Sequence, residues 1–130
     1  MKISALALGL FLTIGTATAA SATVVLSEFP PGTVKDLIAI CAPDKDDPMM
    51  TASINYCHGY AQGAVTVEMA HGAQRHSHPL FCLPKPPPAS GAELGSFIAW
   101  ANQDPSRLDE PAIDGMFLYL AQKYPCENAK

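Results

Sequence analysis

Apolar residues recur at three- and four-residue steps in four stretches of the chain, and proline, glycine and charged residues separate these stretches. Steps of this size place the apolar residues of a stretch on one face of a helix. The first such helix is expected to begin near Gly32 or Thr33 and to stop before Pro43. Its apolar positions are Val34, Leu37, Ile38 and Cys41.

The second stretch predicts the longest helix, from about Pro48 to Ala70, with Gly72 ending it. One face of this helix is expected to carry Ile54, Cys57, Ala61, Val65 and either Glu68 or Met69. Gly59 and Gly63 fall on a neighbouring face. Because a glycine costs a helix interior roughly 1 kcal/mol relative to alanine, the pair suggests that another backbone packs closely there.

Polar residues mark where the helices begin. Asp46 or Asp47 is expected to cap the second helix, with Pro48 at its first position. The third helix follows Ser90 and Glu93, which have the spacing of a capping box. The apolar faces of the third and fourth helices contain Leu94, Phe97, Ile98 and Ala101, and then Ile113, Met116, Phe117, Leu120 and Tyr124. The pattern therefore predicts an all-α fold, a small bundle of four mostly short helices.

Residues 1–22 have the pattern of a signal peptide. Lys2 precedes an apolar run, and small residues around Ala20 and Ala22 offer cleavage sites. The apolar run is shorter than the roughly 20 residues of a membrane-spanning helix. We therefore expect cleavage after Ala22, a mature domain of residues 23–130, a periplasmic location and no membrane contact after cleavage.

The charge of the mature domain argues against several classes of partner. Removal of residues 1–22 takes away only Lys2, which leaves seven basic residues against twelve acidic ones and a formal net charge of −5. Nucleic acids and anionic lipids bind clusters of Lys and Arg, so neither is an expected partner. A protein partner remains compatible with this charge.

Four cysteines, an even number, lie in the mature domain: Cys41, Cys57, Cys82 and Cys126. Small exported domains bury too little surface to dispense with covalent links, so two disulfides are expected. Four cysteines allow three pairings, and the order of the helices favours two bonds. Cys41 and Cys57 would join the first two helices. Cys82 and Cys126 would close the base of an antiparallel hairpin made by the last two.

The connection His71 to Pro88 contains five prolines and a glycine, so it is not expected to hold regular structure. A connection of this length inside a small domain is often functional. It carries Arg75, Lys85 and three histidines, which make it the one locally basic segment. His76 and His78 could also hold copper or zinc, although the segment offers no carboxylate or free thiol beside them.

The sequence contains none of the common enzyme motifs. No G-x-S-x-G, H-E-x-x-H or glycine-rich phosphate loop is present, and paired cysteines provide no thiol nucleophile. No cofactor is expected either. The protein is therefore interpreted as a binding protein and not as an enzyme.

Several short motifs resemble the Rap/Tai immunity proteins, which are small exported helical domains associated with type VI secretion. The matching residues are Cys57-His58-Gly59-Tyr60 with Gly63, Phe81-Cys82-Leu83-Pro84, Leu118-Tyr119-Leu120-Ala121 and Tyr124-Pro125-Cys126. The chain departs from the family pattern at Ala61, after Gly63, and in the proline-rich Lys85-Pro86-Pro87-Pro88.

The resemblance implies a periplasmic immunity protein that binds a secreted peptidoglycan amidase effector and blocks its substrate groove, often as a homodimer. We expect the connection from His71 to Pro88 to fill the groove, with Arg75, His76, His78 and Phe81 as contacts. Two other functions fit the sequence: an acid-stress chaperone of the HdeA type, and a metal-binding protein that uses the histidines of this connection.

Overall fold

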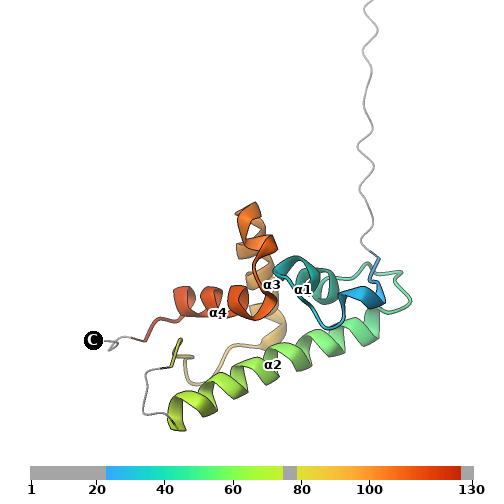
Figure 1. Cartoon of the computed structure of the whole chain (residues 1–130). Helices are drawn as coiled ribbons and strands as arrows, with labels where there is room; N and C mark the ends of the chain where they lie inside the picture. Colours follow the sequence, from blue (N-terminus) through green and yellow to red (C-terminus); the bar gives the residue numbers. More distant parts are fainter. Residues whose placement is uncertain (1–22, 75–78, 127–130) are drawn as a thin grey trace, which may run out of the picture.

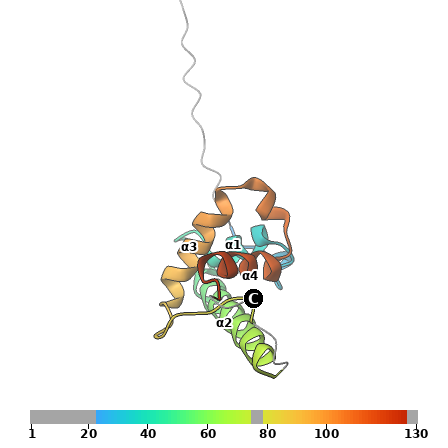
Figure 2. The same ribbon diagram turned by 90° about the vertical axis from the view of Figure 1, so that its left-hand side faces the viewer.

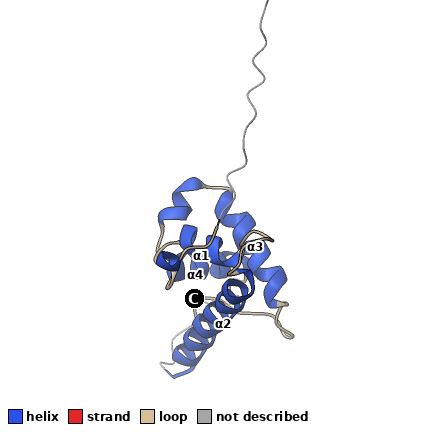
Figure 3. Cartoon of the chain, turned by 90° about the vertical axis from the view of Figure 1, so that its right-hand side faces the viewer, coloured by secondary structure: helices blue, strands red, loops and turns tan. Residues whose placement is uncertain are grey.

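The computed structural model describes residues 23–74 and 79–126 of the chain. In these residues all regular structure is helical, and Figure 3 shows the described chain as helix and loop without a strand. The predicted all-α fold is confirmed. The elements are η1 (Leu26–Glu28), α1 (Val34–Cys41), α2 (Met50–Gln74), α3 (Ser90–Asn102), η2 (Pro105–Asp109) and α4 (Ala112–Lys123).

Helix α1 begins where its capping residues lie. The Thr33 hydroxyl accepts a hydrogen bond from the backbone N–H of Asp36, and the Asp36 carboxylate accepts one from the N–H of Thr33. This reciprocal pair satisfies donors that the first turn of a helix leaves free. Three side chains of α1 are buried: Val34, Leu37 and Ile40.

Helix α2 begins and ends later than its sequence predicts. Asp47 occupies a turn before the helix, where one carboxylate oxygen accepts from Met49 N and the other from Val24 N, both at 2.7 Å. The helix continues past Gly72, which was wrongly expected to end it. Gly72 is buried because Pro79 packs against it; a β-carbon at Gly72 would lie 3.3 Å from the Cβ of Pro79. This glycine therefore serves a close contact and not a helix end.

The main core lies between α1, α3 and α4 and one face of α2 (Figures 1 and 2). Its buried residues include Val34, Leu37, Phe81, Phe97, Met116, Tyr119 and Leu120, and α2 contributes the partly buried Tyr60, Ala61, Ala64 and Val65. Helices α1 and α4 are in close contact at Gly115. A β-carbon there would collide with the Val34 side chain, so only glycine fits.

Both expected disulfides are present. Cys41 is bonded to Cys57, with 5.2 Å between their Cα atoms, and Cys82 to Cys126, with 5.0 Å. The geometric reason given for the second bond is wrong, because α3 and α4 cross and do not run antiparallel (Figure 1). Instead, the segment before α3 runs past the end of α4, and Cys82 N donates a 2.8 Å hydrogen bond to the carbonyl of Tyr124.

Two further sequence expectations need correction. Apart from α2 itself, nothing in the described residues lies within 4 Å of a β-carbon placed at Gly59 or Gly63, so none of those residues packs its backbone on that face of α2. The cap of α3 is Ala89 and not Ser90. The Ser90 hydroxyl bonds to His58 and the Glu93 carboxylate to α4, so neither side chain is free to form the predicted capping box.

The length and composition of the helices also bear on membranes. Among the residues that the structure describes, no helix combines the length and the hydropathy that crossing a bilayer requires.

Candidate functional site

The second half of α2 extends away from the other helices in all three views (Figures 1, 2 and 3). Its side chains are largely exposed. Val67 keeps 59% of its surface accessible and Met69 52%. The sequence left open whether Glu68 or Met69 belongs to the inner face, and the structure places the half-buried Glu68 there. We call residues 66–71 of α2, together with Pro79 and Leu80, the outer end.

The chain that returns from the outer end is fixed at three points. Leu80 N donates to a carboxylate oxygen of Glu68 at 3.3 Å, which joins the returning chain to α2. Two residues later, the Cys82–Cys126 bond and the hydrogen bond from Cys82 N to Tyr124 join it to the end of α4. The outer end is therefore held in place from two helices.

Of the four residues that were expected to contact a partner, the structure describes only Phe81. Arg75, His76 and His78 lie outside the described residues. Phe81 is only 2% exposed, and its ring lies 5.8 Å from that of Phe117 in the main core. Leu80, which the sequence analysis did not single out, is 54% exposed beside it. Phe81 thus anchors the segment, and Leu80 supplies its outward apolar surface.

The alternation of Leu80 and Phe81 could have been found from the sequence. Successive residues of an extended segment point to opposite sides, so one of two adjacent apolar residues faces outward. What the sequence lacks is the phase of the alternation, which the packing of Phe81 against Phe117 fixes.

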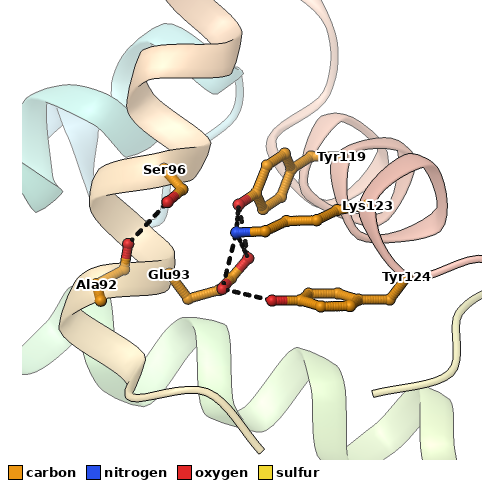
Figure 4. A network of polar contacts seen from close by, with 6 residues as sticks. All are labelled: Ala92, Glu93, Ser96, Tyr119, Lys123 and Tyr124. Atoms are coloured by element: carbon orange, nitrogen blue, oxygen red, sulfur yellow. Dashed lines mark hydrogen bonds and ion pairs between the residues drawn. The ribbon is translucent and has the colours of Figure 1, made fainter. Parts of the chain in front are cut away.

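A second feature is a network of polar groups between α3 and α4 (Figure 4). The Glu93 carboxylate accepts hydrogen bonds from Tyr119 OH at 2.6 Å and from Tyr124 OH at 2.9 Å. Lys123 Nζ donates to both of its oxygens, at 2.9 and 3.1 Å. These bonds tie the first turn of α3 to the last turns of α4.

The network shifts the pKa values of its members. Partial burial by itself would raise the pKa of Glu93, but hydrogen bonds from Tyr119, Lys123 and Tyr124 outweigh it and hold the pKa below its ordinary value of 4.5. The same contacts, first with Tyr119 and then with Glu93, raise the pKa of Lys123. Glu93 and Lys123 are therefore charged together over the neutral range.

Beside this network lies an open cavity of about 350 Å³ between α2, α3, α4 and the proline-rich segment. Its floor is apolar and comprises Leu94, Phe97, Met116 and Leu120. His58, which was expected to be a polar edge residue of the central helix, lies at its rim with Nδ1 2.8 Å from the Ser90 hydroxyl.

The described residues offer no evident metal centre. No group of three or more His, Cys, Asp or Glu side chains in ranges 23–74 and 79–126 is placed to hold an ion. The suggested histidine ligands His76 and His78 lie outside those ranges, so metal binding by the connection stays a prediction.

Comparison with known proteins gives one family. The family model of the Rap1a immunity proteins matches residues 33–126, which begin at the cap of α1 and end at the last disulfide cysteine. Searches of curated proteins and of solved structures give no match. The matched range includes all four α-helices and both disulfides. The chain therefore belongs to the Rap1a immunity protein family.

Proposed function

We propose that this immunity protein acts in the periplasm, where it binds a secreted peptidoglycan amidase effector and blocks the substrate groove of that enzyme. The observation that carries the proposal is the family match over residues 33–126 together with an outer end that extends from the molecule. Steric blocking needs a rigid projection and no chemistry of its own. The covalent and hydrogen-bonded fixing of the returning chain supplies that rigidity.

The periplasmic location is supported by the cysteines. Both pairs are oxidised, and structural disulfides persist in compartments such as the periplasm and rarely in the cytosol. The signal-peptide pattern of residues 1–22 agrees with this location.

The interaction surface that we propose is the outer end with the neighbouring basic residues. Leu80 and Met69 supply exposed apolar area, which anchors many interfaces once it is desolvated. Arg75 would add positive charge and His76 and His78 further polar contacts to a protein that is acidic elsewhere, so the cognate groove should be apolar with an acidic margin. Phe81 contributes indirectly, because its buried ring packs against Phe117 and anchors the segment that carries Leu80.

The test is binding to a peptidoglycan amidase effector, sought first among the products of neighbouring genes and measured by calorimetry with the oxidised protein. We expect the double substitution of Met69→Ser and Leu80→Ser to weaken the Kd at least about tenfold, because both residues are exposed and little else changes. The matched control is Leu26→Ser in η1, which removes a leucine that is 76% exposed outside the proposed surface. The control should leave the Kd unchanged.

A second variant tests the basic residues. Replacing Arg75, His76 and His78 together by alanine should slow association and reduce its dependence on salt. The proposal fails if neither variant changes binding, or if the control weakens it as much. The family resemblance also implies a homodimer. Light scattering of the free protein and of the complex decides whether the protein binds the effector as a homodimer.

A further inference from the structure

The cavity beside the Glu93 network has apolar walls and a polar rim. Residues of α3 and α4 form its apolar floor, and Leu83, Pro87 and Pro88 of the proline-rich segment form an apolar side wall. A volume of about 350 Å³ lies in the range of small-molecule sites. Prolines and buried core side chains change shape little, so the site is preformed.

The opposite rim is a row of polar side chains on α2. His58, Gln62 and Thr66 follow one another at four-residue steps and therefore lie along one face of the helix. The Thr66 hydroxyl donates its proton to the carbonyl of Gln62 at 2.7 Å. Its oxygen keeps the capacity to accept a hydrogen bond, on a residue that lines the cavity.

The charge at the site is already balanced. Among the described lining residues, Glu93 is the only Asp, Glu, Lys or Arg, and its ion pair with Lys123 balances its charge. Its carboxylate also accepts four hydrogen bonds, which is the usual capacity of that group. A charged ligand would thus lie against apolar walls without a counterion, and such burial is costly.

We propose that this cavity is a binding site for a small neutral aromatic molecule with one N–H or O–H donor. The ring lies on the floor of Phe97, Leu94 and Met116, whose aromatic and thioether groups pack favourably against a ring. The donor points to the rim on α2, where Thr66 Oγ1 accepts its proton. Thr66 is the one lining residue that the cavity shares with the outer end, and binding of a small ligand there does not require the amidase.

The first experiment titrates indole into the oxidised protein and follows backbone amide signals by two-dimensional NMR. We expect saturable shifts confined to the segments that line the cavity, chiefly residues 58–66 of α2 and 90–97 of α3. Shifts that do not saturate, or that spread evenly over all helices, overturn the proposal.

A matched pair of substitutions on α2 tests whether indole binds in the cavity. Val65→Phe fills the cavity and should weaken indole binding at least about tenfold, whereas Val67→Phe adds the same ring to an exposed position and should leave it unchanged. If Val65→Phe does not fold, Gln62→Phe replaces it, because Gln62 lines the rim and is exposed. Equal effects of the filling and control variants overturn the site.

A matched pair of ligands tests the chemistry. Benzofuran has the shape of indole but an oxygen in place of the N–H, so it should bind about threefold to tenfold more weakly. In Thr66→Val, which removes the acceptor and keeps the shape, the two ligands should bind alike. Equal affinity of the two ligands for the unaltered protein overturns the donor requirement.

The ring could belong to a free molecule or to a tryptophan side chain of a partner. The blocked tripeptide Gly-Trp-Gly distinguishes these sources. Binding equal to that of indole, or tighter, assigns the site to a side chain on a chain; markedly weaker binding assigns it to a free molecule. Either result retains the cavity as an aromatic site, and absence of binding by both probes overturns it.

Discussion

The two halves of α2 belong to one continuous helix but have opposite surroundings. In the first half, Ser53 and Cys57 are fully buried, and the bond from Cys57 to Cys41 attaches the helix to α1. In the second half, Val67 and Met69 are exposed and the helix extends beyond the body of the protein. The first half contributes to folding, whereas the second half presents a surface.

This difference separates stability from recognition within one element. A substitution in the buried half should change the free energy of unfolding, because it removes packing or a covalent link. A substitution of an exposed side chain in the outer half, such as Val67 or Met69, should leave that free energy nearly unchanged and alter only binding to a partner. Four measurements test how sharp the division is.

The largest effect is expected where the two environments adjoin, at Leu80 and Phe81. Phe81→Ala should lower the free energy of unfolding by about 3–5 kcal/mol, because it leaves a cavity in the main core. Leu80→Ala should lower it by less than about 0.5 kcal/mol. Urea denaturation measures both, and similar values for the two neighbours would remove the basis for the division.

The next effect concerns the covalent link of the buried half. Replacing Cys41 and Cys57 together by alanine should cost roughly 3 kcal/mol, since the bond closes a loop with a sequence separation of 16 residues. The amide signals of the outer end should remain unshifted in the variant. A variant as stable as the parent would show that packing alone attaches α2 to α1.

Two glycines give effects of opposite sign. Gly115→Ala should destabilise the protein by about 1–3 kcal/mol, because its β-carbon collides with Val34. Gly63→Ala should stabilise it by up to about 1 kcal/mol, because no atom of the described residues other than the local backbone of α2 lies within 4 Å of the added carbon. Destabilisation by Gly63→Ala in dilute protein would mean that this face of α2 is covered in solution.

The smallest effect is a dependence on pH. The pKa of Glu93 is lower in the folded protein than its ordinary value of 4.5, so its contribution to stability is complete above that value and is lost as the pH falls through the lower folded value. Asp36, held by the backbone N–H of Thr33, also has a lowered pKa and acts in the same direction. The melting temperature of Glu93→Gln should fall less steeply with decreasing pH than that of the parent protein. An equally steep fall would exclude Glu93 as a source of the pH dependence of stability.

Local features of the fold were predictable because their causes are local. The capping pair Thr33 and Asp36 lies within one turn, and the period of the apolar residues places α1, α3 and α4 within a few positions. The cysteine pairing was also predicted correctly. The reason given for the second bond was nevertheless wrong, because α3 and α4 cross and do not form the expected antiparallel hairpin.

The failures involve residues whose role depends on a distant neighbour. Gly72 has the sequence of a helix end, but the contact with Pro79 makes it an interior residue. Ser90 and Glu93 have the spacing of a capping box, but the Ser90 hydroxyl is hydrogen-bonded to His58 and the Glu93 carboxylate to Tyr119 of α4. Met69 could not be placed on either face by periodicity alone.

The sequence by itself determined the helical class, the number of long helical stretches and the presence of two disulfides, because apolar period, prolines and cysteines act over short distances or by simple counting. Only the tertiary structure decided which of Leu80 and Phe81 faces outward, where α2 leaves the body and how α2, α3 and α4 enclose a cavity. Each of these depends on the angle at which helices cross, and that angle follows from the packing of side chains far apart in the chain.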